Sequence, residues 1–199
     1  SINNVDYKGE LREYYLSFFP SFGEIKLGKQ IYAWGAVDAS SPIDILNPIN
    51  YYYLFTDTDE TKIGRESLAI DFYLERLKIG IIFMPNHITN NIPENDPDFP
   101  ITLPASPKSY QILEQNDLDK SIEIGAYFKA SSNNTDLTFS YFSGYDRNFN
   151  LYGSKVYRSY RNESITVVDT IFSYRQTDMV SLSSTSFIGD LTLRADFAY

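Results

Sequence analysis

The sequence predicts an all-β chain built from antiparallel hairpins, and three observations support this prediction. Aromatic residues make up 16% of the 199 residues, with 17 Tyr and 14 Phe, and such residues favour strands over helices. Apolar and polar residues alternate with a period of two along most of the chain, which is typical of strands with two unlike faces. Clusters of Asn, Asp, Ser, Gly and Pro separate the alternating runs, as hairpin turns require. We therefore expect one β unit spanning residues 1–199.

Four pairs of alternating runs predict four hairpins and about eight strands. In each pair, apolar side chains recur at every second position of both runs, and a turn-forming cluster separates the two runs. The pairs are 11–19 with 24–34, 68–75 with 77–83, 121–129 with 137–141, and 165–187 with 191–197. Outside these runs, residues 110–120 are the best candidate for a short helix.

The connections are of two kinds. Those inside the hairpins are short, whereas those between hairpins are long, at about 35–67, 85–120 and 146–164. Soluble β-sandwiches seldom place every long loop at one end of a sheet. Outer-membrane barrels do so, with short turns at the periplasmic end and long loops outside. The pattern therefore predicts an antiparallel up-and-down transmembrane β-barrel, with short turns at one end and long loops at the other.

Composition excludes several classes of function. The net charge of −9 and the scattered Lys and Arg residues leave no basic surface for nucleic acid. The chain has no Cys, so disulfides and thiolate metal sites are excluded. The longest apolar run, 79–85, is far shorter than the roughly 20 residues of a membrane helix. Any membrane contact must therefore be made by strands.

Alternation alone is compatible with two architectures. In a soluble sandwich or lipocalin-like barrel the apolar face forms the core, whereas in a membrane barrel it meets lipid and the polar face lines the lumen. Aromatic residues gather near the predicted strand ends, where they resemble the interfacial girdles of membrane barrels, although aromatic residues are also ordinary components of a β core. The candidate interface aromatics are Tyr32, Trp34, Tyr141 and Tyr199.

Several short motifs resemble porin-like outer-membrane β-barrels of Gram-negative bacteria. The run "LGKQIYAWG" begins at Leu27 and is followed by Asp38, "SPIDILNP" at 41–48 and "KIGRESLAI" at 62–70. The tail "QTDMVSLSSTSFIGDLTLRADFAY", from Gln176, is similar to later hairpins of these families. The resemblance implies a transmembrane barrel in the outer membrane that passes small solutes by passive or selective diffusion, with membrane lipid around it and no enzyme activity. A homo-oligomer is compatible with this role. Such chains generally have more strands, and strands similar to "LRAD" at 193–196 usually lie in the middle of them. The resemblance therefore favours a part of a larger barrel over a complete eight-stranded barrel.

Charged residues on the polar faces are the candidates for a lumen. Rings of such side chains set the preference of a pore for ion sign, and the overall acidity favours cations or neutral solutes. In a soluble protein the same charges would lie on the solvated face. The candidate lumen-facing residues are Lys26, Asp71, Glu75, Lys78, Glu123, Arg194 and Asp196.

No residue pattern points to catalysis, a cofactor or a metal site. The single histidine, His87, lies in a proline-rich stretch and is interpreted as a surface loop residue. The acidic run 57–61 lacks the Gly and distal Glu of a calcium loop, and Asp38 and Asp44 suit Asx-turns. Two other functions remain open, namely a soluble ligand-binding module and a plugged structural or adhesive membrane barrel.

Overall fold

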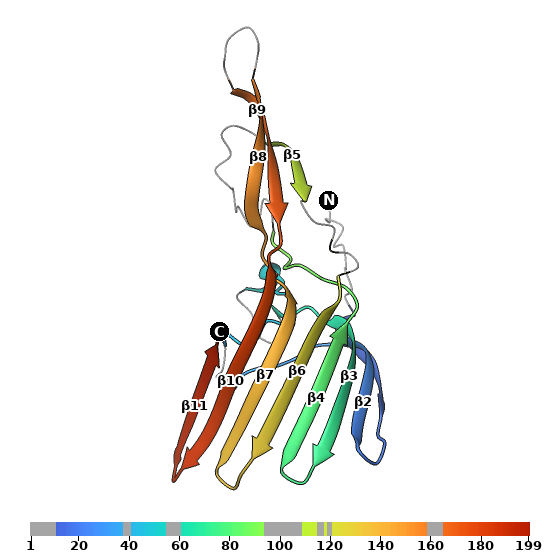
Figure 1. The fold of residues 1–199 in the computed structure, drawn as a ribbon, viewed down its shortest axis with the longest axis vertical. Coiled ribbons are helices and arrows are strands. Elements are labelled where there is room, and N and C mark those ends of the chain that lie inside the picture. Colours follow the sequence, from blue (N-terminus) through green and yellow to red (C-terminus); the bar gives the residue numbers. More distant parts are fainter. Residues whose placement is uncertain are drawn as a thin grey trace, which may run out of the picture.

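The computed structural model describes residues 11–37, 41–54, 61–93, 109–114, 118, 121–158 and 165–199. These residues form two sheets (Figure 1). The larger is an eight-stranded antiparallel meander with the order β1-β2-β3-β4-β6-β7-β10-β11, and the smaller has the order β5-β9-β8. The strands are β1 (Tyr14–Phe18), β2 (Gly23–Gln30), β3 (Arg65–Leu74), β4 (Leu77–Met84), β5 (Ser109–Glu114), β6 (Glu123–Ser131), β7 (Thr135–Tyr145), β8 (Asn150–Arg158), β9 (Ile165–Ser173), β10 (Gln176–Ile188) and β11 (Leu191–Ala198).

All four hairpin turns of the larger sheet lie at one end of it (Figure 1). Two-residue turns join β3 to β4 and β10 to β11, where Leu74 pairs with Leu77 and Ile188 pairs with Leu191. Gly189 has a φ of +62° in the second of these turns, a conformation that favours glycine. The longer connections leave the opposite end of the sheet, so the predicted asymmetry of turns and loops is present in the fold.

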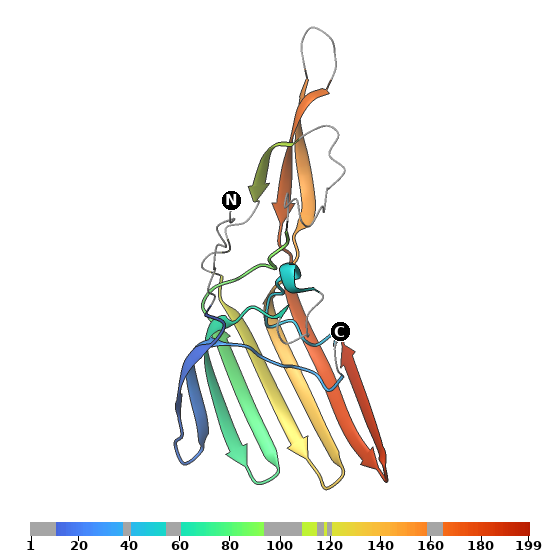
Figure 2. The same ribbon diagram turned by 180° about the vertical axis from the view of Figure 1, so that it is seen from behind.

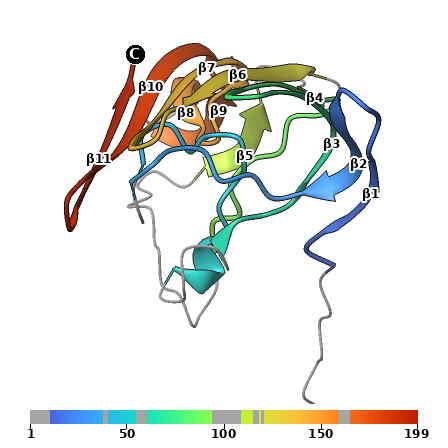
Figure 3. The ribbon, with the colours of Figure 1, turned by 90° about the horizontal axis from the view of Figure 1, so that it is seen from below.

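The larger sheet is an open arc and not the closed barrel that the sequence predicts. Among the described residues, β1 pairs only with β2 and β11 pairs only with β10. Viewed along the strands, the sheet is curved, with β1 and β11 at its two edges (Figure 3). The segment between β2 and β3 crosses the inner side of this curve, passing from the β2 side of the sheet to β11 (Figures 2 and 3).

The two faces of the arc differ in chemistry. The face covered by the crossing segment, here called the concave face, carries Ser67, Asp71, Tyr127 and their neighbours at every second position. The opposite face, here called the convex face, carries large apolar side chains that are mostly exposed. They include Leu16, Leu27, Phe72, Leu74, Leu77, Ile79, Ile81, Phe83, Ile124, Phe128, Leu137, Phe139, Val180, Leu182, Leu191, Leu193 and Phe197.

The buried core lies on the concave face, beneath the crossing segment. Ile43 and Leu46 of that segment are buried against apolar side chains from the sheet. The sheet contributes Ala69, Ile82, Met84, Phe142 and Met179 to this cluster. The burial of Ile43 and Leu46 therefore holds the segment against the concave face by the hydrophobic effect.

Three sequence-based predictions are corrected in and around the smaller sheet. Residues 110–120 were expected to contain a short helix, but 109–114 form strand β5, which pairs in parallel with β9. The connection expected at 146–164 contains strand β8, which pairs with β9 in antiparallel fashion. The run predicted at 165–187 is divided into β9 and β10 at residues 174–175. In the described part of the chain, no helix is long and apolar enough to cross a membrane.

Candidate functional site on the concave face

The chain leaves the sheet after β2, where its backbone forms hydrogen bonds with the Asn47 side chain and not with a neighbouring strand. The Asn47 side chain accepts a hydrogen bond from the Tyr32 amide at 2.7 Å and donates to the Ile63 carbonyl at 2.8 Å. It also donates to the Gln30 carbonyl at 3.3 Å. One buried side chain thus joins the start of the segment to its end, which is how the motif "SPIDILNP" acts structurally.

Asp196 of β11 fastens the middle of the crossing segment to the far side of the sheet. Its carboxylate accepts hydrogen bonds from the amides of Ala36 (2.9 Å) and Val37 (3.1 Å) and from the Ser41 hydroxyl (2.6 Å). The Ser183 hydroxyl donates to it at 2.7 Å. The preceding Gly35 has a φ of +104°, which only glycine adopts readily. The predicted lumen residue Asp196 is therefore a clamp between the segment and β11.

Replacing Asp196 by alanine is expected to release this clamp. Hydrogen bonds to a charged acceptor contribute about 1.5–3 kcal/mol each in net terms, so the free energy of unfolding should fall by at least about 1.5 kcal/mol. Hydrogen exchange measured by mass spectrometry should become faster at the amides of Ala36 and Val37. Asp190→Ala, in the β10–β11 turn, is the matched control. Unchanged exchange in Asp196→Ala would show that the segment is held by other contacts.

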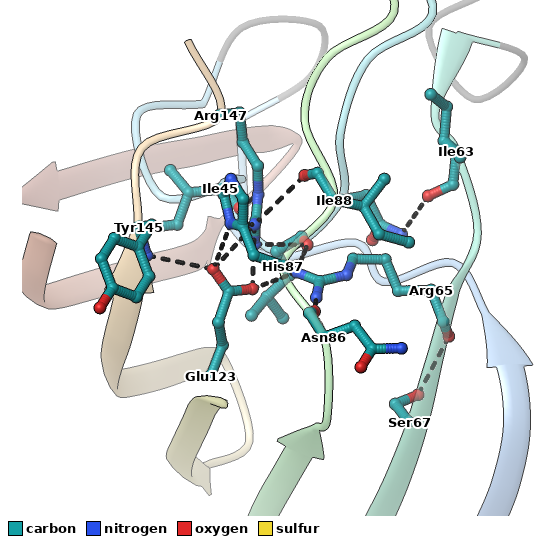
Figure 4. A network of polar contacts seen from close by, with 12 residues as sticks. Ile45, Ile63, Arg65, Ser67, Asn86, His87, Ile88, Glu123, Tyr145 and Arg147 are labelled. Carbon is teal, nitrogen blue, oxygen red and sulfur yellow. Dashed lines mark hydrogen bonds and ion pairs between the residues drawn. The ribbon is translucent and has the colours of Figure 1, made fainter. Parts of the chain in front are cut away.

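A buried ionic cluster holds the loops at the end of the sheet remote from the turns. Glu123 begins β6 and forms ion pairs with Arg65, the first residue of β3, and with Arg147, which follows β7 (Figure 4). The Arg147 pair measures 2.9 Å. His87 Nδ1 lies 2.9 Å from the Glu123 carboxylate, and the Tyr145 amide donates to it at 3.0 Å. Both oxygens of this carboxylate thus accept hydrogen bonds from protein donors.

The two arginines of the cluster also hold the crossing segment. Arg147 donates to the carbonyls of Ile45 at 3.1 Å and Leu46 at 3.0 Å. Arg65 donates to the Leu46 carbonyl at 3.4 Å and also to the Asn86 carbonyl, which follows β4. Burial, together with the charge of Arg65, lowers the pKa of Arg147 to about 10, so Arg147 stays protonated at neutral pH. The cluster therefore sets two buried positive charges against one carboxylate, and its charge balance depends on Glu123.

His87 is buried within this cluster, which corrects its interpretation as a surface loop histidine. Its ring also lies near the rings of Tyr145 and Tyr174. The sequence gives no sign of this environment, because Glu123 and Arg147 are 36 and 60 residues away along the chain. Sequence reasoning also missed both arginines. For Arg65 a signal exists, since continuing the β3 alternation backwards from Asp71 places Arg65 on the concave face.

The other predicted lumen residues are placed as follows. Lys26, Asp71 and Lys78 lie on the concave face and line one cavity, and the alternation of β11 places Arg194 on the same face as Asp196. Glu75 does not lie on a strand face, because it occupies the β3–β4 turn. The structure therefore brings Lys26, Asp71 and Lys78 together, and leaves Glu75 apart from them.

The predicted interface aromatics are divided between the two faces. Tyr32 and Trp34 belong to the crossing segment and turn onto the concave face, where the Tyr32 hydroxyl lies 2.7 Å from the Ser67 hydroxyl and Trp34 contacts the Tyr127 ring edge to face at 6.2 Å. This differs from the predicted girdle, because β2 ends at Gln30 and not at Trp34. Tyr141 lies on the convex face. Tyr199 pairs with Val180 through its backbone.

Of the acidic motifs, Asp44 forms an ion pair with Lys62 at 2.6 Å. Asp38 and residues 57–60 of the acidic run lie outside the described residues. In the described part of the chain, no group of three or more His, Asp or Glu side chains is arranged to hold a metal ion.

Comparisons of the chain with protein-family models, with curated proteins and with solved structures find no match.

Proposed function

We propose that the larger sheet is part of the wall of a transmembrane β-barrel in the outer membrane of a Gram-negative bacterium, and that the barrel passes small solutes by diffusion. The observation that carries this proposal is the reversal of the two faces relative to a soluble barrel. The apolar face is convex and exposed, while most of the charged side chains of the strands lie on the concave face. Lipid is the environment that such a convex face requires.

Among the described residues, the charged side chains of the convex face lie at one end of it only. Its charged residues are Lys29, Glu66 and Asp178, all near the end remote from the turns. The hydroxyls of Tyr14 and Tyr141 donate to Glu66 (3.3 Å) and Asp178 (2.9 Å). Tyrosines with an apolar ring and a polar tip suit the interface between lipid and water. Apart from the five-residue β1, the strands of this sheet have 8–13 residues, close to the roughly 9–11 that a membrane strand needs.

The soluble alternatives fit these faces less well. In a lipocalin-like module the concave face would form an apolar cavity and the convex face would be polar. Here, Lys26, Asp71 and Lys78 line the cavity of the concave face, whereas Ile79, Ile81 and Phe83 are exposed on the convex face. A soluble protein would thus expose an apolar patch larger than monomers ordinarily tolerate.

In a bilayer, both open edges of the sheet must be paired, because unsatisfied backbone groups are costly in lipid. β1 and β11 run in opposite directions within the meander, so the two edges suit antiparallel pairing. We therefore extend the proposal to a barrel that is closed at these edges, either by further strands or by a second copy of the chain. The crossing segment would then narrow the lumen from within.

Membrane extraction and conductance test this function. The chain should remain in the membrane pellet after washing with sodium carbonate, and should be released by detergent. In planar lipid bilayers it should produce stable conductance steps. Release by carbonate alone would contradict the membrane location. Membrane retention without conductance steps would replace the channel by a plugged structural barrel, in which the crossing segment blocks the lumen.

A further inference from the structure

A cavity of about 520 Å³ lies between the crossing segment and the concave face of the sheet. Tyr32, Trp34 and Ile43 form its wall on the side of the segment. On the side of the sheet it is lined by residues of β1, β2, β3, β4, β6, β7 and β10. This volume is within the range of small-molecule sites, and the charges around it indicate what such a molecule would be.

The buried acidic group of this wall is already occupied. One oxygen of Asp71 accepts a hydrogen bond from the Tyr127 hydroxyl at 2.6 Å, and the other pairs with Lys78 at 2.8 Å. The Asp71 side chain is only 13% exposed. Glu13 is exposed, and one of its oxygens accepts a hydrogen bond from the Ile31 amide at 2.7 Å. Asp71 is therefore not well placed to attract a cation into the cavity.

The basic groups of the wall, by contrast, reach into the cavity with donors to spare. Lys26, Lys78 and Lys129 all line it, and their side chains are 32%, 35% and 40% exposed. Each ammonium group has three donors. Among the described residues, each of the three makes a single ion pair, with Glu24, Asp71 or Asp136. The accessible polar groups of the wall are therefore mainly hydrogen-bond donors that carry a positive charge.

Two of these lysines are cross-strand neighbours on the same face of the sheet. Lys78 of β4 and Lys129 of β6 are partners in the register of the two strands. Like charges directly opposite one another in a sheet are destabilising. An anion bound between the two ammonium groups would remove that repulsion and would accept hydrogen bonds from both.

A pair of aromatic rings lies beside Lys78. The Lys78 ammonium lies 5.5 Å from the centre of the Tyr127 ring, and the Trp34 ring meets Tyr127 at a centroid distance of 6.2 Å. A ligand with its negative group at the lysines would thus have a ring surface beside it for an apolar body. An inorganic anion would leave that surface without a partner.

We infer that this cavity binds small organic carboxylates, with the carboxylate between Lys78 and Lys129 and the apolar body against Trp34 and Tyr127. The inference deepens the proposed channel by naming a class of solute, and to that extent it rests on the proposed function. It reverses the preference for cations or neutral solutes that overall acidity predicts, because the buried carboxylate of the cavity, Asp71, is already paired, whereas three lysines of the cavity are accessible.

Trp34 provides the measurement, because it is the only tryptophan of the chain and it lines the cavity. The full chain, folded in detergent, is titrated with benzoate, acetate and benzylammonium while tryptophan fluorescence is recorded. Benzoate should give a saturable change and should bind more tightly than acetate, whereas benzylammonium should give no saturable change. A benzoate titration without saturation, or equal binding of benzylammonium, would overturn the proposal.

Single substitutions assign the binding to the lysine pair. Lys78→Gln and Lys129→Gln should each weaken benzoate binding by about 10-fold, as expected for the loss of one charge-assisted hydrogen bond. Lys78→Arg should retain most of the affinity. Lys155→Gln, on an exposed position of β8 in the smaller sheet, should bind as the unsubstituted chain does. Circular dichroism verifies that each variant is folded. If benzoate binding is unchanged in both glutamine variants, the assignment of the site to Lys78 and Lys129 is wrong.

This titration separates the inference from the proposed channel, since it requires no conductance. Benzoate binding without conductance steps would retain the site and reject the channel. Conductance steps without benzoate binding would retain the channel and reject the site.

Discussion

Replacing Ile81 by arginine should lower the free energy of unfolding by about 2–4 kcal/mol when the protein is embedded in lipid. Ile81 lies in the middle of β4 on the convex face and is 46% exposed. Its neighbours in register are Ile70 and Ala126, so no side chain there can pair with a cation. The loss arises because the guanidinium must enter the hydrocarbon region. Urea unfolding in lipid vesicles, followed by Trp34 fluorescence, measures it.

Leu151→Arg is the matched control for this experiment. Leu151 is 70% exposed on β8 of the smaller sheet, and so does not belong to the convex face that we propose meets lipid. Its substitution should change the free energy of unfolding by no more than about 0.5 kcal/mol, as for most surface positions. If Ile81→Arg has an equally small effect, then the convex face meets water and the membrane barrel is rejected.

Replacing Glu123 by glutamine should lower the free energy of unfolding by about 3–5 kcal/mol. The substitution keeps the size of the side chain but leaves the buried charges of Arg65 and Arg147 without their counter-charge. Because Arg147 also holds the carbonyls of Ile45 and Leu46, the crossing segment should loosen as well. Thermal unfolding measures the first effect, and a shift in the emission of Trp34 measures the second.

Asp136→Asn serves as the comparison for Glu123→Gln. Asp136 also pairs with a lysine, but both side chains of that pair are 40% exposed. An exposed pair of this kind contributes no more than about 1 kcal/mol. If Glu123→Gln costs no more than Asp136→Asn, the buried cluster does not hold the loops in the way the geometry indicates.

The hairpins of the larger sheet were largely predictable from the sequence, because each depends on local pattern. The alternation of 68–75 and 77–83 and the intervening turn correspond closely to β3 and β4. Strand β5 was not predictable in this way, since its partner β9 lies more than fifty residues further along the chain. A short run contains no information about a partner at that distance, and its pattern was therefore interpreted as a helix.

The candidate site was only partly predictable, for a related reason. Alternation correctly places Lys26, Asp71 and Lys78 on a single face, because side-chain direction in a strand is a local property. The position of Trp34 could not be predicted in this way. The Tyr32 amide bonds to the Asn47 side chain, and β2 ends at Gln30, four residues before the end that the pattern predicts. The open edges at β1 and β11 could not be predicted from local pattern either, because pairing between distant strands is not a local property.

The link between the crossing segment and β11 has a consequence for folding kinetics. Asp196 contacts Ala36 across a sequence separation of 160 residues, so this contact forms only after the last hairpin has been added to the meander. Contacts between residues so far apart in sequence make folding slow. The environment of Trp34 therefore reaches its native state last. The fluorescence of Trp34 distinguishes a fully folded chain from one in which only the strands have formed.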